Sequence, residues 1–198
     1  QSDDGEYIYG VHELSAGGAV SAFACKDKLT KVQQVSSGGN GPCHIKVAGE
    51  KLFVANYGSG SWSAYELKDG LIQEGFQTTQ HEGRGPNADR QEGPHTHWVL
   101  WDEKKQIARV ADLGIDHVVN YEKQDDAWVE VSRLDLAPGD GPRSLALNSN
   151  GKIFVTNELG NSVSVFEPDS LEEIQKIGTL PEGYDKESTV SELQFSPD

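Results

Sequence analysis

The sequence contains two kinds of segment that recur along the chain, and this internal repetition restricts the possible folds more than any other feature. The first kind is a Gly-Pro pair followed by alternating residues, seen as GPCHI from Gly41, GPHTH from Gly93 and GPRSL from Gly141. The second is a strand-like run that ends in a polar residue and a glycine turn, seen as FVANYGSGS from Phe53, RVADLGIDH from Arg109 and FVTNELGNS from Phe154. Successive copies lie about 50 residues apart, and units of that length are typical of β-propeller blades.

The repeats predict an all-β fold, a β-propeller with about four blades in this chain. Short runs of alternating polar and apolar residues are separated by Gly, Asn, Asp and Ser, as expected for antiparallel strands joined by turns. Helical solenoids of similar period would need helical stripes, and only a weak one occurs, near 171–177. We therefore treat 1–198 as one partial propeller domain with repeats at roughly 1–47, 48–101, 102–147 and 148–198.

The repeat phase at the two ends of the sequence predicts that the propeller is only partly present. Propellers close rings of about four to eight blades, and the turn signal Ser196-Pro197-Asp198 leads toward a further strand. A complete four-bladed ring is the alternative. In a partial ring, the missing blades of the same protein or a second copy of the segment would cover the open sides. We expect the isolated segment to be inactive.

The net charge disfavours two classes of partner. The chain has 17 Lys and Arg against 32 Asp and Glu, a formal charge of −15. Binding to nucleic acid or to an anionic membrane needs a basic patch, and no run of Lys or Arg supplies one. No apolar run approaches the length of about 20 residues that a membrane-spanning helix needs, and no secretion signal is visible, so we expect a cytoplasmic location. The two cysteines, Cys25 and Cys43, are expected to be free and half-buried.

His95 is the first candidate for proton transfer. Aligning the Gly-Pro segments makes Cys43, His95 and Arg143 equivalent, at the start of a strand where a side chain reaches solvent or a cleft. An imidazole titrates near neutral pH and can move protons in either direction. His97 ranks second, because its counterparts in the other copies are apolar, which favours a core histidine. Two histidines without a further ligand are a weak metal signal, and we expect neither a metal nor a cofactor.

A ring of polar groups is predicted at the ends of the second kind of segment. Aligning the glycine turns makes Asn56, Asp112 and Glu158 equivalent, and Glu13 matches through its Glu-Leu pair. Equivalent positions on successive blades surround the propeller axis, so Asn56 and Asp112 become candidate substrate contacts. Burial of a carboxylate is costly unless it is paired, so Glu158 either faces a wet cleft or pairs with a cation such as Arg143. Alternatively, Glu158 anchors a turn or a hydrogen bond between blades.

Arg143 and Arg90 are the candidates for binding an anion. A guanidinium offers a planar, bidentate clamp for a carboxylate or phosphate, and such local charge would let an acidic protein accept an anionic metabolite. Arg143 could instead form a salt bridge between blades. Arg90 belongs to the long, charged loop 81–92, where it either adds to anion binding or holds the loop through Asp89 and Glu92.

Six segments in order resemble the seven-bladed propeller lactonase family, which is of the 6-phosphogluconolactonase and carboxymuconate lactonizing enzyme type. They are GPCH (41–44), FVANYGSGS (53–61), HEGRGPNADRQEGPHTH (81–97), VADLG (110–114), GPR (141–143) and NELGNSVSVF (157–166). The resemblance implies a seven-bladed ring and a cleft lined by His, Arg and Glu without a required metal. Position by position, it selects His95 with His97 as second choice, Arg143 and Glu158. Ser144 departs from the family pattern, in which an aromatic residue or His follows GPR.

The activity that the resemblance implies is hydrolysis of an anionic sugar lactone such as 6-phosphogluconolactone, a reaction of carbohydrate metabolism. In that reaction Arg143 would bind the negative group, His95 would activate water or shuttle the proton, and Glu158 would orient the imidazole or act as the partner acid or base. One alternative is a lactonizing cycloisomerase that uses the same groups on a carboxymuconate. The other is a non-catalytic propeller that serves as a binding platform, because a fold does not determine a function.

Overall fold

The computed structural model describes residues 1–196, which form antiparallel sheets in sequence order. Sheet 1 contains β1 (Tyr7–His12), β2 (Ala19–Cys25) and β3 (Leu29–Ser36). Sheet 2 contains β4 (Pro42–Ala48), β5 (Lys51–Asn56), β6 (Ser61–Lys68), β7 (Leu71–Ile72) and β8 (Gln77–Gln80), and the short 3-10 helix η1 (Tyr57–Ser59) connects β5 to β6. Sheet 3 contains β9 (Thr96–Asp102), β10 (Ile107–Asp112), β11 (His117–Gln124) and β12 (Ala127–Asp135). Sheet 4 contains β13 (Pro142–Leu147), β14 (Ile153–Asn157), β15 (Ser162–Phe166) and β16 (Glu173–Gly178).

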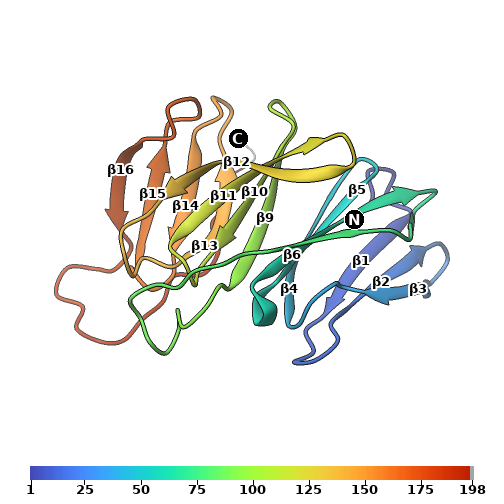
Figure 1. The fold of residues 1–198 in the computed structure, drawn as a ribbon, viewed down its shortest axis with the longest axis horizontal. Coiled ribbons are helices and arrows are strands. Elements are labelled where there is room, and N and C mark those ends of the chain that lie inside the picture. The colour runs from blue at the N-terminus through green and yellow to red at the C-terminus, as the bar shows by residue number, and fades with distance from the viewer. Residues whose placement is uncertain (197–198) are drawn as a thin grey trace.

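The four sheets stand side by side along the long axis of the molecule, from sheet 1 near the N-terminus to sheet 4 (Figure 1). Within each sheet, strands that are consecutive in sequence pair as antiparallel neighbours, except that β8 pairs with β6. The first strands of sheets 2, 3 and 4 also lie against one another, β4 against β9 and β9 against β13. The predicted all-β architecture of successive blades is therefore confirmed.

The apolar core lies between the sheets. One cluster packs sheet 1 on sheet 2 around Tyr9, Val20 and Leu52. A second, rich in aromatic residues, packs sheet 2 on sheet 3, and a third packs sheet 3 on sheet 4. Each sheet can bury both faces only by packing on two neighbours, which is the packing expected of propeller blades.

The limits of the sheets differ from those of the sequence repeats. The repeat boundaries after residues 47, 101 and 147 lie at or near the ends of β4, β9 and β13, strands that pair with the strands following them. Each repeat drawn from the sequence therefore ends with the first strand of the next sheet. Repeats and sheets have the same period but are shifted by one strand.

The strand register corrects the predicted equivalence of Asn56, Asp112 and Glu158. The last residues of β5, β10 and β14 are Asn56, Asp112 and Asn157, which pair with Ser61, His117 and Ser162. Glu158 lies one residue further, so its counterparts are Tyr57 and Leu113. The prediction was wrong by one position because the glycine turns differ in the number of residues before their glycine. Glu13 also follows the end of its strand by one residue, so its match to Glu158 holds.

The register also corrects the predicted equivalence of Cys43, His95 and Arg143. The backbone N–H groups of Tyr57, Leu113 and Glu158 donate to the carbonyl oxygens of Gly41, His95 and Gly141. His95 therefore takes the position of two glycines, and His97 is the counterpart of Cys43 and Arg143. The prediction was wrong by two residues because the pair Gly93-Pro94 belongs to the long loop, and Thr96 takes the place of Pro42 and Pro142.

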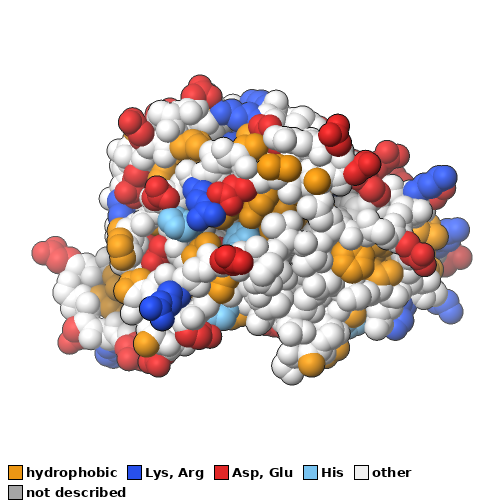
Figure 2. Space-filling view, viewed as in Figure 1, with side chains coloured by type: hydrophobic (Ala, Val, Ile, Leu, Met, Phe, Trp, Pro, Cys, Tyr) orange, Lys and Arg blue, Asp and Glu red, His pale blue; other side chains and the backbone are white. Residues whose placement is uncertain are grey.

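Charged side chains are distributed over the molecule without a basic patch on the face that Figure 2 shows: acidic side chains lie across it and around its rim, with Lys and Arg among them. Both cysteines are free and partly buried, as predicted. Within residues 1–196, no helix is long and apolar enough to span a bilayer.

Candidate active site

Glu158 forms the centre of a cluster of ionised groups. It follows β14, and the fold leaves it 4% exposed. Arg90 Nη2, from the loop before β9, donates to Glu158 Oε1 at 2.6 Å, and Arg143 Nη1, from β13, donates to Oε2. Burial acts to raise the pKa of Glu158, but the hydrogen bonds and charges of the two arginines outweigh it, and the pKa falls below its ordinary value. Of the three alternatives considered for Glu158, the structure contains the ion pair with Arg143.

His97, the second residue of β9, lies within the electrostatic reach of this cluster. Burial, followed by the positive charge of Arg143, lowers the pKa of His97 to about 4, so the ring is neutral at pH 7. Its Nδ1 atom is buried and has no hydrogen-bond partner among the described residues. The ring meets the Tyr57 ring edge-on, with centroids 5.6 Å apart. A neutral imidazole keeps a lone pair on one of its two ring nitrogens and can accept a proton there.

His95 lies immediately before β9, and its ring contacts Tyr57 and Glu92. Its ring stacks on Tyr57 with centroids 4.5 Å apart, Nδ1 lies 3.0 Å from the carbonyl oxygen of Tyr57, and Nε2 lies 3.2 Å from Glu92 Oε1. Both ring nitrogens of His95 therefore have an oxygen partner, whereas Nδ1 of His97 has none among the described residues. The sequence ranked His95 above His97, and that order stays a prediction.

Asn56 and Asp112, predicted as substrate contacts, are fully buried and bind groups of the surrounding strands and loops. Asn56 Nδ2 donates to the carbonyl oxygen of Ser37 and to Ser63 Oγ at 3.2 and 3.3 Å. Asp112 Oδ1 accepts the backbone N–H groups of His95 and Gly114 at 2.7 and 2.9 Å. The structure therefore does not bring these two side chains into the cluster around Glu158, and Asp112 contributes only through the backbone of His95.

Tyr57 is a residue of this site that the sequence did not indicate, and Glu92 was considered only as a partner of Arg90 that would hold the loop. Tyr57 contacts both histidine rings, and its hydroxyl, after Glu158, helps to raise the pKa of Arg90. A correct strand register would have indicated Tyr57, because Tyr57 is the counterpart of Glu158 in sheet 2. Glu92 is exposed and contacts only His95 in the site.

The loop 81–95 can approach sheet 2 closely because the residue that it meets there, Gly60, has no side chain. At Gly60 the backbone is left-handed, with φ of 61°, and a Cβ there would lie 2.3 Å from the carbonyl oxygen of Pro94. Any side chain at this turn between β5 and β6 would displace the loop. The close approach sets the backbone just before His95 and His97 against sheet 2.

The arginine cluster carries an excess of positive charge. Arg90 and Arg143 contribute two positive charges, Glu158 contributes one negative charge, and His97 is neutral. A cavity of about 510 Å³ is lined by Asn87 of the same loop, by Leu159, which follows Glu158, and by Asn161 and residues 186–189, and the ionised side chains of the cluster are not part of its lining. Despite the overall charge of −15, the neighbourhood of Glu158 is therefore suited to one anionic group.

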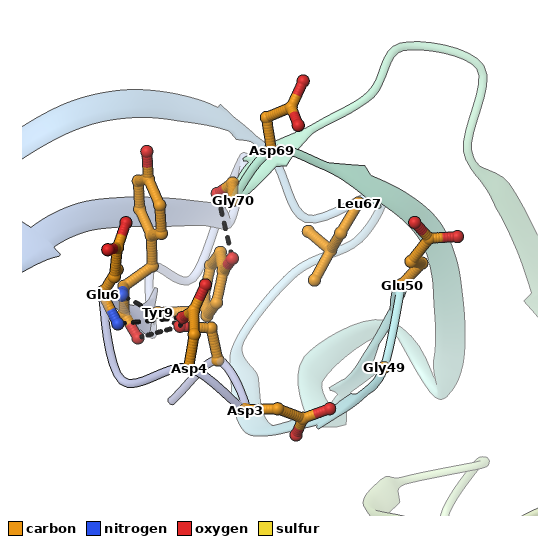
Figure 3. A pocket seen from close by; sticks show the side chains of 11 residues that line it. Asp3, Asp4, Glu6, Tyr9, Gly49, Glu50, Leu67, Asp69 and Gly70 are labelled. Atoms are coloured by element: carbon orange, nitrogen blue, oxygen red, sulfur yellow. Dashed lines mark hydrogen bonds between the residues drawn. The ribbon is translucent and has the colours of Figure 1, made fainter.

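A second cavity, of about 540 Å³, lies at the opposite end of the sheet 2 strands and has the opposite character (Figure 3). Its lining includes the carboxylates Asp3, Asp4, Glu6, Glu50 and Asp69. These charges repel an anion. In the described part of the chain, no group of three His, Cys, Asp or Glu side chains is arranged to hold a metal ion.

The antiparallel sheets, their packing through shared cores and the lateral contacts of their first strands define the chain as part of a β-propeller. A family model described as "Lactonase, 7-bladed beta-propeller" matches residues 1–198, and the chain belongs to this family. The fold and the resemblance expected from the sequence are both confirmed.

Individual relatives agree with this assignment. The chain is 30% identical to the 6-phosphogluconolactonase of Bacillus subtilis (strain 168) over 202 residues, which cover 96% of this chain and 58% of that protein. It superposes on a putative 6-phosphogluconolactonase from Bacteroides fragilis NCTC 9343 with a TM-score of 0.83 at 29% identity, covering 89% of this chain and 55% of that one. The periplasmic gluconolactonase of Pseudomonas aeruginosa shares the fold, with a TM-score of 0.85 at 24% identity over 99% of this chain and 61% of that one. The chain thus spans just over half the length of these relatives.

Proposed function

We propose that the protein containing this chain hydrolyses an anionic sugar lactone, such as a phosphorylated gluconolactone. The observation that carries the proposal is the shared carboxylate: two arginines bind Glu158 and leave one positive charge in excess beside a neutral histidine. The names of the relatives, which include 6-phosphogluconolactonases, support the same substrate class.

Substrate binding uses the excess positive charge. The guanidinium of Arg143, assisted by Arg90, binds the anionic group of the lactone, and Glu158 keeps both guanidiniums oriented. Guanidiniums that are already held in place lose little conformational freedom when the anionic group binds.

Proton transfer is assigned to His97. The imidazole accepts a proton from water as the water oxygen bonds to the lactone carbonyl carbon, which gives a tetrahedral oxyanion. When the ring C–O bond breaks, the leaving alkoxide takes that proton back, and the product is the open hydroxy acid. The pKa of about 4 keeps the ring neutral at pH 7 before substrate binds, and the negative charge of a bound substrate raises its basicity.

A kinetic comparison of two histidine variants tests this function. In the full-length protein that contains this chain, we expect the phosphorylated lactone to be hydrolysed with higher kcat/KM than the unphosphorylated one. His97→Gln should reduce kcat by about 10²- to 10⁴-fold with little change in KM, the usual effect of removing a general base.

His44→Gln is the matched control. His44 is also a histidine whose pKa burial lowers, to about 3, but its ring stacks on Trp98 and its Nδ1 accepts the N–H of Val99. This variant should lose stability and keep kcat. An unreduced kcat in His97→Gln would contradict the role of His97, and cyclisation of a carboxymuconate without lactone hydrolysis would favour the lactonizing alternative.

A cytoplasmic location stays a prediction.

A further inference from the structure

Asp116 lies in the turn between β10 and β11, outside the cluster around Glu158, and is 6% exposed. Its backbone is left-handed, with φ of 57°, a conformation that Asp and Asn tolerate better than other side chains with a Cβ. Its carboxylate accepts three hydrogen bonds. Oδ1 accepts Gln91 Nε2 at 2.7 Å and the N–H of Gly141 at 2.8 Å, and Oδ2 accepts the N–H of Gly139 at 2.8 Å.

The donors to Asp116 come from the two segments that carry the arginines. Gln91 is the neighbour of Arg90 in the loop 81–95, and Gly141 precedes Arg143 by two residues. The carbonyl oxygen of Gly141 in turn accepts the backbone N–H of Glu158 at 2.8 Å. One carboxylate therefore connects the chain segments of all three members of the ionised cluster.

Gln91, which donates to Asp116, is itself held by further hydrogen bonds. It is fully buried, and its Nε2 also donates to the carbonyl oxygen of Leu113 at 2.8 Å, while its Oε1 accepts the N–H of Asn87 at 3.1 Å. A fully buried amide with all these partners fixes the middle of the loop to sheet 3. The loop has no strand or helix of its own, and these side-chain bonds join the residue next to Arg90 to sheet 3, in addition to backbone bonds within the loop.

The neighbouring buried aspartates make other connections. Asp112 binds His81 and the backbone of His95, at the two ends of the loop. Asp140 binds Lys176 of β16 and the N–H of Ala137. Of these aspartates, Asp116 is the one whose carboxylate contacts both the middle of the loop and the turn before β13.

We propose that Asp116 is a positioning residue of the lactonase site: it holds the loop of Arg90 and the turn before Arg143 at a fixed separation, so that both guanidiniums reach Glu158 together. This inference rests on the proposed function. Asp116 does not itself touch the substrate.

Asp116→Asn in the full-length protein is the direct test. The amide keeps the size of the side chain and tolerates the left-handed backbone, but its NH₂ group cannot accept a hydrogen bond, so at least one of the three donors loses its acceptor. Trypsin should then cleave after Arg84 or Arg90 about tenfold faster, because the bond from Gln91 that holds the loop is either lost or becomes a weaker bond to a neutral acceptor.

A pH profile separates positioning from simple destabilisation. The charged and titratable groups that act on Glu158 are Arg90 and Arg143, and His97 lies beside them. If Asp116→Asn releases the guanidiniums, they stabilise the ionised form of Glu158 less, and the acid limb of kcat/KM moves to higher pH. Asp102→Asn is the control: Asp102 is similarly buried but binds Arg109 at the other end of β9. It should lower stability and leave both the acid limb and the cleavage rate unchanged.

The outcomes are distinguishable. A shifted acid limb together with faster cleavage supports the inference, and an unshifted limb in Asp116→Asn overturns it even if the variant is less stable. If the wild-type protein hydrolyses no lactone, the proposed function fails, and the cleavage rate still decides whether Asp116 holds the loop. Should Asp116→Asn not accumulate as folded protein, Gln91→Met removes the loop-side bond to Asp116 together with the bonds of Gln91 to Leu113 and Asn87, leaves the bonds of Asp116 to Gly139 and Gly141 in place, and the same two readouts apply.

Discussion

Glu158 and His97 represent two ways in which burial acts on an ionisable residue. Burial disfavours the charged form of both, but Glu158 has two guanidiniums within hydrogen-bond distance and remains ionised. His97 has no such counter-charge bonded to it and becomes neutral. The contacts that a residue makes with Arg143 thus determine whether burial leaves it ionised or neutral.

Stability in acid should reveal the neutral state of His97. Its pKa in the folded protein is about 4, compared with 6.5 for the free side chain. An unfolded chain therefore binds a proton at a higher pH than the folded one, and the stability from this residue is present above about pH 6.5 and is lost as pH falls toward 4. The loss is up to about 3 kcal/mol.

Urea unfolding at a series of pH values would measure this effect. We expect the free energy of unfolding to fall between pH 6.5 and pH 4, and to fall less steeply in His97→Gln, which has no group to titrate in that window. Below that window, loss of charge on Glu158 removes its ion pairs in both proteins, because the folded-state pKa of Glu158 lies below its ordinary value of 4.5. Equal slopes for the two proteins between pH 6.5 and pH 4 would show that His97 is not buried in its neutral form.

At the scale of elements, the turn between β10 and β11 acts as the support of the loop 81–95. Asp112 holds the beginning and end of the loop, and Asp116 holds its middle. Between them lies Gly114, where a Cβ would lie 1.9 Å from the carbonyl oxygen of Gly93 and 2.8 Å from the nitrogen of His95. The neighbouring atoms belong to the backbone and cannot rotate away.

Gly114→Ala should therefore reduce both stability and activity. Overpacking of this kind typically costs about 1–3 kcal/mol, and the displaced backbone carries His95 directly and His97 two residues later. Thermal unfolding and lactonase kinetics would be compared with Gly178→Ala, since a Cβ at Gly178, the last residue of β16, meets nothing within 4 Å. Wild-type kinetics in Gly114→Ala would mean that the loop yields without affecting the site.

The elements were more predictable from the sequence than the contacts between them. Alternating residues and glycine turns are local signals, and they were sufficient to predict strands, blades and the all-β class. The register around His95 and His97 was not predictable from the Gly-Pro pairs, because the long loop brings its own Gly-Pro pair two residues before the strand position. The ion pair between Arg90 and Glu158 joins residues far apart in sequence through a loop without repeat counterpart, and no periodic signal describes such a contact.

For the whole molecule, the decisive feature is that cores form between sheets rather than within them. Sheets 2 and 3 each pack on two neighbours, while sheets 1 and 4 each share a core cluster with one. The segment 188–195 lies against part of sheet 4, where Thr156 Oγ1 donates to the carbonyl oxygen of Ser191 and the ring of Phe154 meets that of Phe195 edge-on. All six residues of β16 are exposed, including Ile174 and Ile177.

This arrangement supports the expectation that the isolated segment 1–198 associates and is inactive. Sheets 1 and 4 expose apolar side chains, with Leu29 60% and Ile177 52% exposed, and burying them against a second copy is favourable. The site would also lack any group contributed by blades that the longer relatives possess, and a charge cluster open to water orients a substrate poorly. Size-exclusion chromatography with light scattering should detect dimers or larger species, and lactonase assays should detect turnover far below that of the full-length protein. A monodisperse monomer with turnover equal to the full-length protein would show instead that four sheets form a self-sufficient unit.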